Sequence, residues 1–198
     1  MGASIPSGRI PRNYKEVEWV GTNGQQTIPN AVIDTGWAPK ATPKMVTKIM
    51  LLATGSRSMF GISSTNVTPI WVLYSASTTG YYKWGGGGSG TYTNIETWTW
   101  LDVEAGKQLK INGIVKSTGA DTKWSENTNT LKLFHGFSPQ AQSRYKEILL
   151  YEEQALVRDL IPCYRKADNR CGFYCLVTNQ FYTCAGSADT LTKGADVS

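Results

Sequence analysis

The sequence predicts an all-β protein, folded as a sandwich or jelly roll of two antiparallel sheets. Charged residues make up only 18% of the chain, while 20 glycines, 7 tryptophans and 10 tyrosines favour short strands and tight turns. More than ten short apolar or alternating segments recur at spacings of roughly 8 to 12 residues, with turn residues between them. This rhythm is typical of β-sandwiches, and helical periodicity is almost absent.

The chain is long enough for one domain with an extended N-terminal arm. A protein of 198 residues buries roughly 70% of the surface that its unfolded chain exposes, which is enough for a single sizeable core. Residues 1–12 contain Pro6, Gly8 and Pro11 and show no periodicity. We therefore expect residues 1–12 to form an arm and residues 13–198 to form the domain.

The predicted strands of the first half share period-2 alternation or a short apolar run bounded by turn residues. They cover residues 14–20, 27–37, 45–53, 58–63 and 69–75. In the first of them, Val17 and Trp19 lie on one face. The segment 45–53 is apolar enough to be a buried strand.

The second half continues in the same way. Strands are expected within residues 96–106, 107–117, 129–137 and 143–153. The pair Asn112-Gly113, between Ile111 and Ile114, predicts a two-residue type I′ hairpin, because both central residues accept positive φ. Only residues 152–160 could form a short helical turn.

Charge and hydropathy argue against two classes of partner. The net charge is +5, but the basic residues are scattered, and the cluster Arg158, Arg165, Lys166 and Arg170 is expected to be a solvated hairpin face. No nucleic-acid-binding signature accompanies it. No segment has the ~18 apolar residues of a membrane span, and the N-terminus lacks the apolar region of a secretory signal. We expect neither nucleic acid nor membrane as a partner.

Catalytic and metal-binding patterns are weak. Asp102 and Glu104 share one strand face, as exposed acids commonly do, and His135, the only histidine, lies in a predicted strand without a nucleophile motif. The four glycines at 85–88 are not followed by the Lys and Ser or Thr of a phosphate-binding loop. No Asp-rich loop suggests calcium. We expect a non-enzyme with no cofactor and no metal.

Both ends of the chain carry motifs of a known family. The opening "YKEVEWVGTNGQQTIPNAVIDTG" and the closing "ALVRDLIPCYRKADNRCGFYCLVTNQFYTCAGS" resemble laminin-G-like, concanavalin A-like jelly-roll domains of bacteriophage tail, fibre and virion surface proteins, which also occur in prophage-encoded and bacterial surface proteins. Cys163 falls where the family pattern has its cysteine. Cys175 and Cys184 replace residues that are usually Asp and Asn, and Cys171 is additional.

The resemblance implies a place and partners. It implies a tail, fibre or capsid-decorating protein on the virion surface, made in the host cytoplasm. Such a protein would contact other virion proteins through its arm and form a homo-oligomer, a trimer rather than a dimer. Its lectin-like sandwich would attach weakly, in many copies, to cell-surface or mucus glycans. The alternatives are a purely structural virion protein and an adhesin domain on a bacterial cell surface.

One aromatic segment is the predicted glycan site. Tyr81, Tyr82, Trp84 and Tyr92 surround a glycine loop, and aromatic faces beside an adaptable loop suit stacking on sugar rings. The alternative is that the alternating aromatics belong to the core.

The four cysteines, Cys163, Cys171, Cys175 and Cys184, are disulfide candidates. If the last hairpin turns at residues 179–180, Cys175 faces Cys184; if it turns at 178–179, the two are diagonal neighbours. Cys163 and Cys171 would then pair with each other. Reduced thiols are the alternative, and the spacing lacks the C-x2-C pairs of zinc sites.

Overall fold

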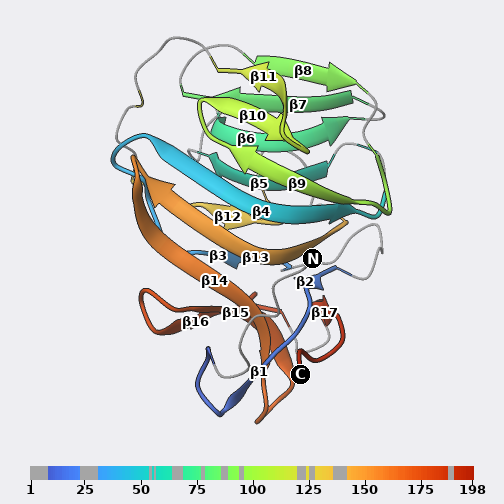
Figure 1. Cartoon of the computed structure of the whole chain (residues 1–198), viewed down its shortest axis with the longest axis vertical. Coiled ribbons are helices and arrows are strands. Elements are labelled where there is room, and N and C mark those ends of the chain that lie inside the picture. Colours follow the sequence, from blue (N-terminus) through green and yellow to red (C-terminus); the bar gives the residue numbers. More distant parts are fainter. Residues whose placement is uncertain are drawn as a thin grey trace.

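The computed structural model describes residues 9–22, 31–53, 55, 57–63, 69–76, 79–85, 89–93, 96–119, 124, 128–135, 142–186 and 190–198. Within them the chain forms two antiparallel sheets that pack face to face (Figure 1). The predicted all-β sandwich of two antiparallel sheets is therefore confirmed. Residues 1–8 of the predicted arm lie outside the described residues.

The larger sheet has the order β11-β10-β9-β4-β13-β14-β15-β16. In addition, β1 pairs with β14, β2 pairs with β13, and β17 pairs with β2. Its strands are β1 (Tyr14–Glu16), β2 (Val20–Gly21), β4 (Pro43–Leu51), β9 (Trp100–Ala105), β10 (Gln108–Ile111), β11 (Ile114–Thr118), β13 (Ser143–Glu152), β14 (Ala155–Arg165), β15 (Arg170–Cys175), β16 (Gln180–Tyr182) and β17 (Thr192–Lys193).

The smaller sheet has the order β3-β12-β5-β6-β7-β8. Its strands are β3 (Ile33–Asp34), β5 (Arg57–Ser63), β6 (Pro69–Ala76), β7 (Thr79–Trp84), β8 (Ser89–Thr93) and β12 (Lys132–Leu133). In Figure 1 the larger sheet lies in front, so the view looks onto its outer face.

The core between the sheets is rich in aromatic side chains. Trp71 on β6 is fully buried and meets Phe60 edge to face, with ring centroids 5.4 Å apart. Tyr145 on β13 donates a hydrogen bond of 2.6 Å from its hydroxyl to the carbonyl oxygen of Met59 on β5, which joins the two sheets. Large aromatic surface and satisfied polar tips together stabilise this interior.

Two local predictions have opposite outcomes. Asn112 and Gly113 have φ of 52° and 77° and connect β10 to β11, so the type I′ hairpin is confirmed. The helical turn expected over 152–160 is wrong. Glu153, at φ 56°, lies in the tight turn between β13 and β14, and residues 155–160 pair with β13 along a ladder. Pairing with a long central strand outweighed the weak local helix preference.

Candidate functional site

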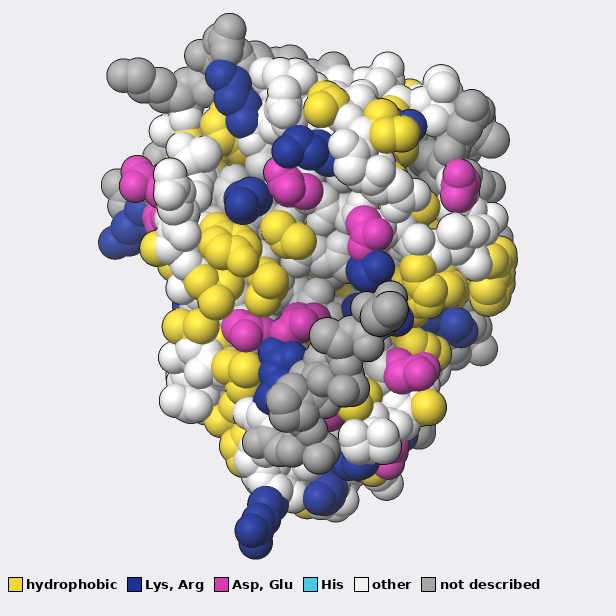
Figure 2. Space-filling view, in the orientation of Figure 1, with side chains coloured by type: hydrophobic (Ala, Val, Ile, Leu, Met, Phe, Trp, Pro, Cys, Tyr) yellow, Lys and Arg dark blue, Asp and Glu magenta, His cyan; other side chains and the backbone are white. Residues whose placement is uncertain are grey.

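A groove of about 680 Å³ crosses the outer face of the larger sheet. Its apolar floor comes from Val46 on β4, Leu149 on β13 and Ile161 on β14. Val46 and Leu149 are directly opposite in the ladder, so their side chains lie on the same face of the sheet. Side chains two residues further along each strand share this face. Figure 2 shows hydrophobic side chains gathered over β4 and β13, with acidic and basic side chains beside them.

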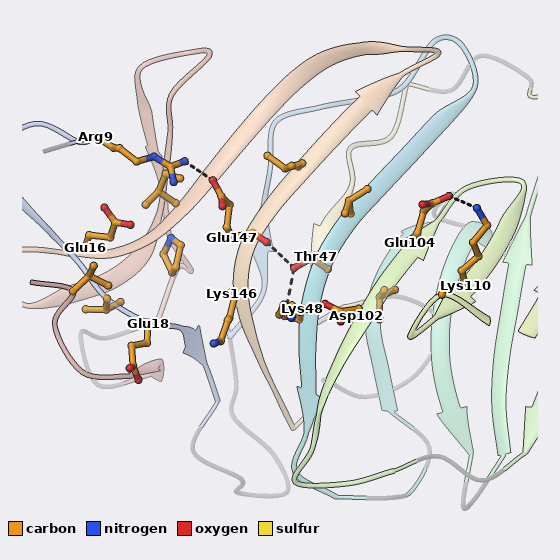
Figure 3. A pocket seen from close by; sticks show the side chains of 18 residues that line it. Arg9, Glu16, Glu18, Thr47, Lys48, Asp102, Glu104, Lys110, Lys146 and Glu147 are labelled. Carbon is orange, nitrogen blue, oxygen red and sulfur yellow. Dashed lines mark hydrogen bonds and ion pairs between the residues drawn. The ribbon is translucent and has the colours of Figure 1, made fainter. Parts of the chain in front are cut away.

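Ion pairs on β4, β9 and β10 form one side of the groove. Lys48 lies 2.8 Å from Asp102, and Lys110 lies 2.9 Å from Glu104 (Figure 3). These side chains are largely exposed, so each pair contributes little to stability. Asp102 and Glu104, expected to be ordinary surface acids, line the groove, where Asp102 is exposed and Glu104 is half-buried.

The opposite side of the groove holds three carboxylates around one guanidinium. Arg9 forms an ion pair with Glu147 (Figure 3). Its guanidinium also lies 3.5 Å from Asp159. Glu16 on β1 is close enough for its charge to act on Arg9 and Glu147. Burial raises the pKa of Glu16. Burial and the Glu147 carboxylate raise the pKa of Asp159 to about 6.

Residues 9–12 of the predicted arm contact the domain. Besides the contacts of Arg9, the carbonyl oxygen of Arg12 accepts a hydrogen bond of 2.7 Å from Lys166 Nζ, and that of Pro11 accepts one from the backbone N–H of Tyr14. Residues 9–12 of the predicted arm thus lie against their own domain through the contacts of Arg9 and Arg12. Arg9 and Glu147 are 138 residues apart in the sequence, so no local pattern signals their ion pair.

A β-bulge in β13 shapes the middle of the groove. Between the pairs Tyr145–Ile49 and Ile148–Thr47, two residues of β13, Lys146 and Glu147, oppose one residue of β4. Both consecutive side chains consequently line the groove (Figure 3). The Thr47 hydroxyl donates a hydrogen bond of 2.9 Å to the Glu147 carbonyl oxygen and holds the bulge in place.

We expect Asp159→Asn to stabilise the protein at neutral pH. A carboxyl whose pKa is raised in the folded state binds its proton more tightly there than in the unfolded chain, so the free energy of unfolding falls as pH rises from about 3.8 through about 6. The amide of the variant carries no charge, so it removes the repulsion between Asp159 and Glu147. Solvent screening at this partly exposed group limits the gain to about 1 kcal/mol at pH 7.

Urea unfolding at pH 7 and at pH 3.5 measures this effect. The variant and the parent should differ at pH 7 and converge at pH 3.5, where both side chains are neutral. A variant that is less stable than the parent at pH 7 would mean that the Arg9–Asp159 attraction outweighs burial and the repulsion from Glu147.

The predicted aromatic glycan site is wrong. Tyr82 and Trp84 are only 1% and 2% exposed, because β7 alternates strictly and its even-numbered residues face the core. Tyr92 on β8 is 8% exposed and belongs to the same core. Tyr81 is half-buried and stacks on Tyr74, with ring centroids 4.8 Å apart. Three of the four rings therefore cannot present a face to a sugar. The glycines at 86–88 lie outside the described residues.

The four cysteines are buried thiols in the structure. β15 and β16 are joined by the four-residue turn 176–179, with Asn179 at φ 55°, and Cys175 pairs with Gln180. Both predicted registers for Cys175 and Cys184 were wrong, because the turn is longer than two residues. Continuing the observed register places Cys184 opposite Cys171 instead. Burial raises the pKa of the Cys163 thiol to about 12, which keeps it unreactive.

The basic cluster is bound by its own chain. Arg165 pairs with Asp168, Lys166 donates to Arg12, and Arg170 donates to the Gly186 carbonyl oxygen at 2.6 Å. Arg158 donates to the Val157 carbonyl oxygen at 2.7 Å. These contacts agree with a solvated hairpin face. His135 follows β12 in a turn, and burial lowers the pKa of its imidazole.

No group of three or more His, Cys, Asp or Glu side chains among the described residues is placed to hold a metal ion. Nor do those residues form a helix long and apolar enough to cross a membrane.

Comparisons with known proteins find distant structural similarity. No protein-family profile and no curated protein sequence matches the chain. Trypanosoma rangeli sialidase in complex with sialic acid superposes with a TM-score of 0.46 and 11% identity, over 76% of this chain and 32% of the sialidase. A Caenorhabditis elegans galectin superposes with a TM-score of 0.39 and 10% identity, over 68% of this chain and 95% of the galectin. The chain thus spans about a third of the sialidase.

Proposed function

We propose that the chain is a non-enzymatic binding module that presents its sandwich on a phage virion surface and attaches to glycans through the groove on the larger sheet. The observation that carries the binding part is the composition of the groove: an apolar floor between charged rims. Sugar C–H faces can pack on Val46 and Leu149. The carboxylates can accept hydrogen bonds from sugar hydroxyls, and the ammonium groups can donate hydrogen bonds to them. The virion part rests on the resemblance of the opening and closing segments.

Binding suits this groove better than glycoside cleavage. Hydrolysis requires two carboxyl groups that flank the scissile bond with room for substrate or water between them. Here Arg9 lies between Glu147 and Asp159 and engages both, while Lys48 and Lys110 engage Asp102 and Glu104. Single-site affinity in an open, solvated groove is weak, so useful attachment depends on many copies acting together.

We expect the double variant Glu104→Gln, Lys110→Met to bind glycans about tenfold more weakly than the parent, since it loses charged hydrogen-bonding groups without leaving an unpaired charge. The measurement is binding to a printed array of bacterial surface and mucin oligosaccharides, with the chain displayed in multiple copies. Arg165→Met, Asp168→Asn neutralises a similarly exposed pair away from the groove and serves as the matched control.

An array without signal for the parent chain, or equal signals for parent and groove variant, would remove the groove as a glycan site. The burial of Tyr82, Trp84 and Tyr92 favours a second candidate, a purely structural virion protein. In that case purified particles would contain the chain while the array stays blank.

A further inference from the structure

Three tryptophans and two cations gather at one end of the groove. This tryptophan platform consists of Trp19, Trp98, Trp100, Arg144 and Lys146. Arg144 on β13, Met50 on β4 and Trp100 on β9 form one row across three neighbouring strands, so their side chains share the outer face. Lys146 also lines the groove, which makes the platform continuous with it.

The two cations lie against the indole rings. The Arg144 guanidinium is 4.1 Å from the ring centroid of Trp19 and 5.8 Å from that of Trp98, and Lys146 Nζ is 4.9 Å from the ring centroid of Trp100. Such contacts orient a cation over an aromatic face. Stacking leaves the edge of a guanidinium and its N–H donors available to a ligand.

Neither cation has an anionic partner among the described residues. No ion pair found there involves Arg144 or Lys146, the buried Nε of Arg144 lacks a hydrogen-bond partner, and its Nη1 reaches only Met50 Sδ at 4.0 Å. Burial lowers the pKa of Arg144, as expected where no carboxylate compensates the lost hydration. Buried polar groups normally find a partner, so a guanidinium whose buried Nε has none, and which has no carboxylate beside it in the described part of the chain, points to a ligand.

Trp98 is held in an unusual conformation. Its φ is 59°, a costly value for a bulky side chain, and its N–H donates a hydrogen bond of 2.7 Å to the Leu51 carbonyl oxygen. Its side chain is nevertheless 62% exposed, more than any other exposed large hydrophobic residue described. Backbone strain persists where the surroundings impose it and recurs at ligand sites. Here the strain presents an indole face to solvent beside Arg144.

We propose that the tryptophan platform binds a carboxylated sugar, with its ring stacked on Trp98 and its carboxylate bound by Arg144 and Lys146. An exposed indole face accepts the apolar C–H face of a sugar ring, and a guanidinium binds a carboxylate through two parallel N–H donors. This assignment deepens the proposed function. It rests on that function in one respect only, namely that the neutral sugar units of a longer glycan would continue along the groove.

The charges around the platform favour an acidic sugar over single-stranded nucleic acid, the other ligand that stacks on aromatics. Nucleic-acid tracks need a continuous cationic channel for successive phosphates. The neighbouring groove instead carries Glu18, Asp102, Glu104 and Glu147. Because Asp102, Glu104 and Glu147 are paired with cations, the groove alternates in charge and offers no continuous cationic channel, while its carboxylates can still accept hydrogen bonds from sugar hydroxyls.

Methyl β-D-glucuronide and methyl β-D-glucoside test the proposal, because they differ only in whether carbon 6 carries a carboxylate or a hydroxyl. The indole N–H resonances of the seven tryptophans are followed by NMR during each titration. The resonance missing from the Trp98→Gly variant identifies Trp98. We expect the glucuronide to shift it at concentrations about tenfold lower than the glucoside does.

Three variants separate binding from folding. Arg144→Gln should weaken glucuronide binding about tenfold, whereas Arg158→Gln, which changes an arginine on neighbouring β14, should leave it unchanged. Trp98→Gly should abolish binding without lowering the thermal midpoint, since glycine adopts a φ of 59° without strain.

Each result decides the proposal. Equal affinity for both glycosides, or an Arg144→Gln variant that binds like the parent, would overturn it, as would an oligothymidylate that binds through Arg144 while the glucuronide does not. The groove variant Glu104→Gln, Lys110→Met should still bind methyl glucuronide. Retained binding there, with a lost array signal, shows that the two sites fail independently.

Discussion

Replacing Trp71 with Ala is expected to lower the free energy of unfolding by about 3–5 kcal/mol, the range for deleting a large buried aromatic side chain. Trp71 is fully buried, and its ring meets those of Trp37, Phe60 and Trp124 edge to face. Its Nε1 donates a hydrogen bond of 3.0 Å to the Tyr82 hydroxyl, which in turn donates to the carbonyl oxygen of Gly106, between β9 and β10 of the larger sheet. The deletion would leave a cavity in the centre of the core and remove the Trp71–Tyr82 hydrogen bond.

Urea unfolding followed by circular dichroism measures the loss. Trp98→Ala makes the same deletion at an exposed position and should cost less than about 1 kcal/mol. Equal losses in the two variants would contradict the assignment of Trp71 to the centre of the core.

Replacing Gly172 with Ala is expected to cost about 1–3 kcal/mol through overpacking. A Cβ atom at this position would lie 2.2 Å from the carbonyl oxygen of Tyr182 and 2.9 Å from the Phe181 ring. The first of these atoms is backbone and cannot rotate away, so β15 and β16 must separate. The damage should concentrate in the last hairpin.

Hydrogen exchange tests this localisation, because amide protection in β15 and β16 should fall more than in β4 and β13. Gly106→Ala is the matched control, since its nearest contact would be an ordinary 3.5 Å. Wild-type stability of Gly172→Ala would show that the hairpin adapts without cost.

The regular elements and one turn could be predicted from the sequence because their causes are local. Alternation, β-branched and aromatic content and frequent turn residues indicated strands. Asn112-Gly113 determined its own hairpin, since both residues tolerate the positive φ that the turn requires. The weak helix preference at 152–160 failed for the opposite reason, because a long-range ladder with β13 decided that segment.

The direction of each alternating face was decided by the tertiary structure. Both faces of an alternating strand repeat every two residues, so the sequence of β7 does not show which face packs against the other sheet. Packing turned Tyr82 and Trp84 inward, and the exposed ring is instead that of Trp98, ahead of β9. A run of tryptophans at 98 and 100, followed by acids at 102 and 104, was the one signal in the sequence that could have located this outer face.

The sequence by itself therefore determined the strand content, the two-sheet class and the turn at Asn112-Gly113. The structure alone decided the bulge that directs Lys146 and Glu147 into the groove, the ion pair of Arg9 with Glu147, which is 138 residues away, and the register that places Cys175 opposite Gln180. Strand propensity and turn chemistry act over a few residues, whereas register, bulges and charge pairing depend on which strands become neighbours. That choice is made by burial of the whole core.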